Sequence, residues 1–375
     1  MSIVADVVET LEQAYPPRFA ESWDRVGLIC GDPTESVKKV AFALDCTQAV
    51  AEAAVAAGAQ MLVVHHPLLL KGVNSVAANT PKGKVIHTLI TGGCALFAAH
   101  TNADCARPGV NDELASLVGL SEGPAIRPIL SATLDKWGVQ VPALSVEPLK
   151  SALFDAGAGA IGDYRECSFD IPGRGQFRPV EGADPAVGSV GALEHVDEIR
   201  VEFVAPRRLR AAVLSALRSA HPYEKPAFDI VEMASEDDPA TAPGLGRIGE
   251  LPEPMTLRDF TQQVAEALPE TVWGVRSAGD PDALIKRVAV CSGSGDSLLD
   301  EVRSLGVDAY VTSDLRHHPV DEYLRAGGPA VIDTAHYASE FPWTRQAASV
   351  VEKLGVETQV LDIRTDPWVL SAHKS

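Results

Sequence analysis

Positive charge, paired cysteines and long apolar runs are all scarce in this sequence of 375 residues. It has 32 lysine and arginine residues against 51 aspartate and glutamate residues, and its formal net charge is −19, so its average surface repels phosphate backbones. No apolar run approaches the ~18 residues that a membrane-spanning helix needs, and the six cysteines contain no CxxC pair. These absences argue against general nucleic-acid binding, polybasic membrane anchoring, a membrane span, a disulfide framework and a thiolate zinc site.

The sequence does contain enough apolar residues for a sizeable core, because 46% of its residues are hydrophobic and 22% are charged. At roughly 150 residues per domain, its length predicts about two to three domains. Residues 1–19 alternate apolar and acidic positions, where a signal peptide would need a basic end and an apolar stretch. We therefore expect a cytoplasmic globular protein with reduced thiols.

The amino-terminal part has the pattern of a parallel sheet covered by helices. Residues 39–45 (KVAFALD) form a short β-prone run, an alanine-rich helix follows and ends at Gly58, and QMLVVHH forms a second buried strand. This order is a βαβ unit, which implies a parallel sheet. The pattern continues with a helix over residues 83–91, a strand that ends at His100 and a further helix that begins near Asn111.

A second segment, residues 286–363, repeats this order of elements. When Val40 is placed on Val288, Gly58 falls on Gly306 without a gap, and the strand that ends in His100 matches the strand that ends in His336. We interpret the two segments as a diverged internal duplication; the alternative is a chance resemblance between two βαβ units. The predicted helix after the second of these strands covers residues 338–355.

The middle of the chain has a different pattern. Its predicted elements follow the βαββαβ order of a ferredoxin-like module, and residues 235–244 (SEDDPATAPG) have the turn formers and charge of an exit linker. We therefore expect an α/β protein with two duplicated α/β halves and an inserted ferredoxin-like α+β domain. The predicted domains are residues 1–128, the insert at 129–244, and residues 245–375.

Histidines stand at the ends of three predicted strands. His65 and His66 end the second strand, where open α/β sheets place their ligand sites, and Pro67 turns the chain so that both imidazoles can approach one site. A histidine pair alone is more often structural. The hypothesis of a functional site gains weight because His100 and His336 also end predicted strands.

Two of these histidines are followed four residues later by a carboxylate. His336 with Glu340, and His100 with Asp104, have the i, i+4 spacing that places both side chains on one helix face. One such pair is usually a solvated helix face, but two at duplicated positions indicate a metal site. Imidazole and carboxylate ligands without thiolate suit Zn, Mn, Fe or Co. Five or six ligands are too many for one tetrahedral ion and about enough for two divalent cations bridged by a carboxylate.

Other motifs carry weaker signals. The GAGAIG stretch (157–162) matches a dinucleotide-binding pattern but follows a helix, so we interpret it as a tight loop. The SGSGD stretch (292–296) is a plain turn or an anion cradle at a helix start. His317 and His318 fall in the first turn of a helix and fit a solvated pair, and Cys105 fits a buried small thiol.

Five motifs together resemble those of the Nif-three-like family, whose bacterial members are named GTP cyclohydrolase 1 type 2 homologs. They are WDRVGL (23–28), HHPLLLKGV (65–73), AAHTNADCARPGVND (98–112), VTSDLRHH (311–318) and IDTAHYASE (332–340). The middle module, with GAGAIGDYRECSF and HPYEKPAFDI, resembles the insert of the family's longer bacterial members, which is similar to P-II and CutA folds. Departures at Arg25, Lys225, Ser313 and Ala335 affect expected substrate contacts more than metal binding.

The resemblance implies a set of metal ligands. Carried over to this sequence, they are His65, His66, Asp104, His336 and Glu340. The resemblance further implies that Glu340 bridges two divalent ions, that His66 and Asp104 hold one ion, and that His65 and His336 hold the other. A homohexameric toroid with the metal sites facing an internal cavity is also implied.

Two classes of function follow. In the first, the protein is a dinuclear metal-dependent hydrolase of the GTP cyclohydrolase type, in which His100 moves a proton during attack on a small molecule such as a nucleotide. In the second, it is a non-enzymatic protein that handles or senses metals or regulates a partner. Turnover by the metal-loaded protein on a panel of nucleotides and phosphoesters distinguishes them.

Overall fold

The computed structural model describes residues 2–235 and 237–372. The chain divides into two compact units. Residues 1–129 and 239–375 form the first, here called the core unit, and residues 130–238 form the second, here called the middle unit. The mixed α/β class predicted from the sequence is confirmed.

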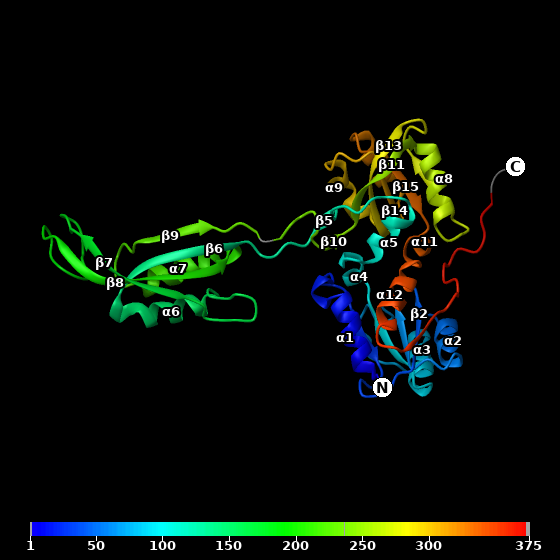
Figure 1. Cartoon of the computed structure of the whole chain (residues 1–375), viewed down its shortest axis with the longest axis horizontal. Helices are drawn as coiled ribbons and strands as arrows, with labels where there is room; N and C mark the ends of the chain where they lie inside the picture. Colours follow the sequence, from blue (N-terminus) through cyan, green and yellow to red (C-terminus); the bar gives the residue numbers. More distant parts are fainter. Residues whose placement is uncertain (1, 236, 373–375) are drawn as a thin grey trace. The chain divides into compact units, whose positions relative to one another are not determined.

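The first sheet of the core unit, to which the strand labelled β2 in Figure 1 belongs, has the strand order β1-β4-β3-β2-β16. Its strands are β1 (Gly27–Cys30), β2 (Lys39–Ala43), β3 (Met61–Val64), β4 (Ala95–Ala98) and β16 (Glu357–Val360). β2, β3, β4 and β16 are parallel, and β1 is antiparallel. Side chains of α2 (Gln48–Ala56) and α3 (Pro81–Thr91) bury one face, and those of α1 (Val4–Ala14) and α12 (Trp343–Glu352) bury the other. Burial of both faces explains the continuous apolar runs of these strands.

The second sheet has the order β11-β13-β14-β15-β12. Its strands are β11 (Arg247–Thr256), β12 (Arg276–Ala278), β13 (Leu284–Ser294), β14 (Ala309–Ser313) and β15 (Ala330–Thr334). β13, β14 and β15 are parallel, and both edge strands are antiparallel. Helices α8 (Leu257–Ala267) and α5 (Val110–Leu117) pack on one face, and α9 (Leu299–Arg303) and α10 (His317–Arg325) pack on the other.

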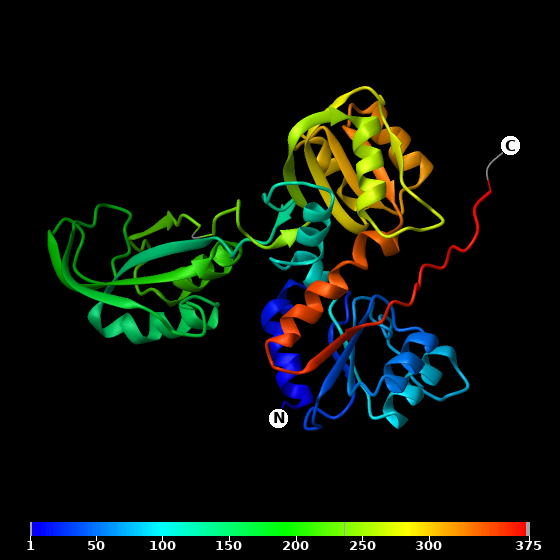
Figure 2. The ribbon, with the colours of Figure 1, turned by 45° about the vertical axis from the view of Figure 1, so that its right-hand side comes forward.

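The two sheets of the core unit exchange helices. α4 (Thr101–Cys105) follows a strand of the first sheet, and the next helix, α5, packs on the second sheet. In the reverse direction, α11 (His336–Glu340) contacts β13 and β14 of the second sheet, and α12 packs on the first sheet (Figure 2). This exchange places α4 and α11 between the sheets, each with the residues of a predicted metal site.

The structure changes one expectation about α11 and α12. Residues 338–355 do not form one helix, because Pro342 cannot continue α11 and instead precedes the first turn of α12. Within the predicted segment 245–375, β16 pairs with β2 of the first sheet.

Equivalent strands in the two sheets share one register. Val40 pairs with Met61 in the first sheet, and Val288 pairs with Ala309 in the second, so both partners stand 21 residues apart. Gly58 and Gly306 also both adopt a positive φ, of 70° and 64°. These equalities agree with the alignment of the two segments, and the duplication itself stays a prediction.

The middle unit is a four-stranded antiparallel sheet of order β7-β8-β6-β9. Its elements follow the chain as β6 (Leu134–Pro142), α6 (Val146–Asp155), β7 (Phe169–Phe177), β8 (Glu194–Pro206), α7 (Arg210–Ala220) and β9 (Phe228–Glu232). The two helices cover one face and bury a separate hydrophobic core around Trp137. Within the core unit, β5 (Arg127–Pro128) pairs with β10 (Gly244–Leu245), so the chain leaves and re-enters the core unit at adjacent points.

Among the described residues, no helix is both long and apolar enough to cross a membrane.

Candidate metal centre

The ends of parallel strands bring the predicted histidines together. His65 and His66 follow β3, His100 follows β4, and His336 begins α11 directly after β15. The rings of His65 and His66 lie 5.0 Å apart, and the ring of His66 lies 5.6 Å from that of His100 and 5.2 Å from that of His336. Residues from both sheets thus meet at one place in the core unit.

Each of these four histidines is held by an acceptor at Nδ1. His66 lies 2.7 Å from Asp45, His336 lies 2.7 Å from Asp314, and His100 lies 2.9 Å from Asp24. His65 lies 2.8 Å from the carbonyl oxygen of Ala99. Since all four partners are acceptors, each Nδ1 donates, which leaves each Nε2 free of its proton in the neutral ring. This arrangement of an acceptor behind an imidazole is typical of metal-binding histidines.

The Nε2 atoms and two carboxylates form groups that could hold metal ions. Their ligand atoms lie within 4.8 Å of one another in three groups: His66, His336 and Glu340; His65, Asp104 and Glu340; and His65, His66 and His100. Glu340 belongs to two of these groups. Its Oε2 lies 2.9 Å from Nε2 of His66, and its Oε1 lies 3.7 Å from Nε2 of His65.

The distances group these residues differently from the ion assignment implied by the resemblance, which stays a prediction. Nε2 of His65 lies 3.6 Å from Asp104, and Nε2 of His66 lies 3.3 Å from Nε2 of His336. The resemblance instead paired His66 with Asp104. The physical reason is that neighbouring residues at a strand end point to different sides, so His65 faces α4 and His66 faces α11.

The local geometry fits a cation between these groups. Nε2 of His65 is buried and has no hydrogen-bond partner among the described residues. Gly293, in the SGSGD stretch, has a φ of 60°, and a Cβ at this position would lie 2.2 Å from Oε1 of Glu340. The stretch therefore leaves space around the carboxylate that any other residue would fill. A buried, unsatisfied imidazole nitrogen facing two carboxylates is a donor set for a divalent cation.

The charges of the centre favour bound positive charge. Burial lowers the pKa of His66, but Glu340 and Asp45 outweigh this effect and raise the pKa to about 10. A similar balance, with Asp314 in place of Asp45, raises the pKa of His336 to about 11. The surrounding histidines hold the pKa of Glu340 well below its usual range despite its burial. The carboxylates thus attract either protons or metal ions to the same nitrogens.

This competition predicts a pH dependence. A cation that binds His66, His336 and Glu340 must displace protons from two imidazoles whose pKa values are raised, so its affinity should fall as the pH is lowered. Titration calorimetry with Mn²⁺ in two buffers of different ionisation enthalpy should show release of about one to two protons per site near pH 7. Binding without proton release would contradict this assignment.

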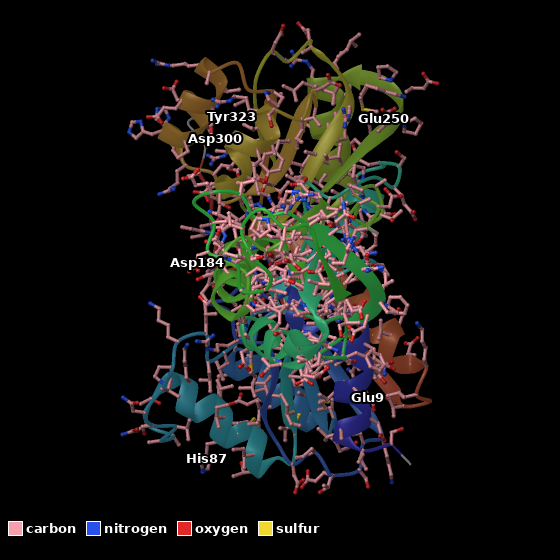
Figure 3. All side chains as sticks on the ribbon, turned by 90° about the vertical axis from the view of Figure 1, so that its left-hand side faces the viewer. Glu9, His87, Asp184, Glu250, Asp300 and Tyr323 are labelled. Atoms are coloured by element: carbon pink, nitrogen blue, oxygen red, sulfur yellow. The ribbon has the colours of Figure 1, made fainter. Side chains whose placement is uncertain are left out.

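A control histidine is available for that titration. His87 is exposed on α3 and belongs to none of the three groups (Figure 3). His87→Ala should therefore leave both the affinity and the proton release unchanged.

Sequence reasoning missed the outer carboxylates and the role of Gly293. Asp45 follows β2 and Asp314 follows β14, so the rule that led to the histidines, a polar residue after a buried parallel strand, would also have found these two. Asp314 also adopts a φ of 58°, which is unusual for a residue other than glycine and often marks a functional site. Asp24 lies in the WDRVGL motif, and the sequence gives no signal that it meets His100.

Other sequence candidates lie outside the centre. His317 and His318 begin α10 as predicted, and neither belongs to the groups described above. Cys105 is buried, and burial raises the pKa of its thiol to about 12, so it fits the predicted small buried thiol.

The fold and the site define a mixed α/β protein with a candidate metal centre at the strand ends of two sheets. Residues 2–367 match the family Duf34/NIF3 (NGG1p interacting factor 3). The chain belongs to this family, as the motifs predicted.

The similarity to individual relatives extends over nearly the whole chain. A Mycobacterium leprae protein named GTP cyclohydrolase 1 type 2 homolog is 54% identical over 375 residues, with 99% of this chain and 96% of the relative covered. A Bacillus subtilis protein of the same name is 36% identical, with 96% and 97% covered. Among solved structures, a Bacillus cereus protein related to NIF3 is 33% identical and has a TM-score of 0.66. The match covers 99% of this chain and 99% of that protein.

Proposed function

We propose that the core unit binds two divalent cations and is a metal-dependent hydrolase. The observation that carries this proposal is the position of Glu340, whose two oxygens face two separate histidine groups. A carboxylate with this placement suits a bridge between two ions. Zn, Fe, Mn and Co all match the imidazole and carboxylate donors.

The residues divide into two sites that share Glu340. His66 and His336 would hold one cation, and His65 and Asp104 would hold the other. Two cations bound in this way supply Lewis acidity, which activates water and polarises a substrate. Asp45 and Asp314 hold their imidazoles in one orientation, so the two Nε2 atoms face the site before a cation arrives.

His100 is placed to move a proton. Its Nδ1 donates to Asp24, which also accepts from the backbone N–H of Thr101. Burial would raise the pKa of Asp24, but the hydrogen bonds from His100 and Thr101 hold it below its usual range. A buried carboxylate that stays ionised orients the ring of His100 and stabilises it when it takes a proton at Nε2.

The experiment that tests the proposal combines metal analysis with turnover. The purified protein loaded with Mn²⁺, Zn²⁺, Fe²⁺ or Co²⁺ is analysed for metal content and assayed on nucleotides and phosphoesters. The names of the relatives make GTP the first substrate to assay. We expect about two ions per chain and metal-dependent hydrolysis. Two bound ions without turnover on any compound would instead favour the alternative function in metal handling or regulation.

We also propose that the middle unit is an inserted module and that the protein forms a homohexamer in the cytoplasm. The insertion is supported by the neighbouring exit and entry strands, since the backbone N–H of Ile129 donates to the carbonyl of Pro243 at 2.7 Å. Adjacent ends allow a domain to be inserted without disturbing its host. Sedimentation analysis of the full chain tests the hexamer.

Deletion of the middle unit tests the insertion. Replacing residues 131–237 with a short Gly/Ser joint should leave a core unit that is folded and retains its metal content, because β5 and β10 already lie side by side. Residues 130–238 expressed alone should also fold, because they have their own core. Circular dichroism, gel filtration and metal analysis measure these outcomes. A shortened chain that is insoluble or free of metal would show that the module is integral.

A further inference from the structure

A cavity of about 330 Å³ lies beside one of the two cation groups. Its lining combines residues of the candidate metal centre with two tryptophans: Asp45, His66, Asp314, His336, Trp273 and Trp368. Its volume is at the small end of the ~300–1,000 Å³ range of small-molecule sites. The cavity therefore fits one small ligand that touches the metal centre and an aromatic wall at the same time.

The aromatic wall consists of Trp273, in the segment before β12, and Trp368, in the carboxyl-terminal segment. Their ring centroids lie 6.0 Å apart with an interplanar angle of 41°. The guanidinium of Arg276 lies 4.6 Å from the centroid of Trp273 and supports that ring. Trp368 nevertheless remains 59% exposed and Trp273 38% exposed, so large aromatic surfaces face solvent beside the cavity.

One carboxylate joins the aromatic wall to the metal centre. Asp45 accepts from Nδ1 of His66 with one oxygen and from the hydroxyl of Thr365 with the other. Thr365 stands three residues before Trp368 in the same segment. The contact that orients a cation-binding imidazole therefore also fixes the segment that carries the tryptophan.

The charges of the cavity limit what the ligand can be. Asp45 and Asp314 both line it, so a second anionic group away from the cations would be repelled. A neutral flat ring, however, gains by stacking on tryptophan, because aromatic faces attract nucleobases regardless of their sequence. An electron-rich group on the same molecule can then reach the side of the cavity formed by His66 and His336.

We propose that this cavity binds a nucleobase, with its ring against Trp273 and Trp368 and its oxygen-rich part toward the cations. The inference rests on the proposed function for the position of the cations, whereas the contact with the two tryptophans does not depend on bound cations. It assigns the carboxyl-terminal segment of residues 365–368 to substrate recognition.

The test measures binding of four probes to the full-length Mn²⁺-loaded protein by titration calorimetry. Guanosine and adenosine supply the ring without phosphate, GTP supplies both, and inorganic phosphate supplies no ring. Trp368→Ala should weaken binding of GTP and of the nucleosides about tenfold or more. Binding of phosphate and the metal content should not change. Trp368→Phe, which retains a ring, should recover most of the lost affinity.

A matched control lies in the same segment. Leu370 is 87% exposed and does not line the cavity, so Leu370→Ala should bind all probes as the unchanged protein does. Equal losses in Trp368→Ala and Leu370→Ala, or no binding of either nucleoside to the unchanged protein, would overturn the inference. Trp368-dependent nucleoside binding without hydrolysis would contradict only the proposed hydrolase. A hydrolysis rate that is the same in Trp368→Ala as in the unchanged protein would contradict only the inference.

Discussion

Replacing Glu340 with glutamine is expected to weaken both cation sites at once. Oε2 of Glu340 lies 3.1 Å from Nε2 of His336, and Oε1 faces His65, so the loss of its charge removes an anionic donor from each group. Changes to residues behind metal ligands typically lower affinity 10- to 100-fold, and loss of a direct carboxylate ligand should exceed ~100-fold. Metal analysis after gel filtration should find less than one ion per chain.

The metal content of Asp104→Asn is the control for the Glu340 variant, because Asp104 is expected to bind only one of the two ions. Asp104 belongs to the group with His65 and not to the group with His66 and His336. Asp104 lies in a dry environment, and this burial raises the pKa of its carboxyl group. The uncharged amide of the variant therefore fits the same buried position. This variant should lose one ion and keep the other. If both variants lose the same number of ions, Glu340 does not bridge.

The fold class and the residues of the centre could be predicted because their signals are local. An apolar run that ends in His65 and His66 defines both a buried strand and the place where its side chains gather. The i, i+4 spacing in HYASE likewise places His336 and Glu340 on one face of a helical turn. Such signals need no knowledge of which elements meet in space.

The remaining features depend on contacts between distant parts of the chain. Asp104 on α4 and Glu340 on α11 come together because α5 and α12 each pack on the other sheet. The sequences of α5 and α12 do not indicate this packing. Asp24 and His100 are 76 residues apart, so no spacing rule joins them. In the sequence, Gly293 resembles an ordinary turn glycine. Only the structure shows that a Cβ at this position would clash with the Glu340 carboxylate.

His100→Ala is expected to separate proton transfer from metal binding. The groups of His66, His336 and Glu340 and of His65, Asp104 and Glu340 are complete without His100. Metal content should therefore stay near that of the unchanged protein, whereas turnover should fall ~10²- to 10⁴-fold, the usual contribution of a general acid or base. Inductively coupled plasma analysis and initial rates on the same preparation measure both quantities.

Asp24→Asn provides the second half of this test. The amide retains the shape of Asp24 but removes the charge that stabilises a protonated His100, so turnover should fall with little change in metal content. The third group, His65, His66 and His100, offers a competing outcome. Loss of one ion per chain in His100→Ala would make His100 a ligand and leave the proton transfer to another residue.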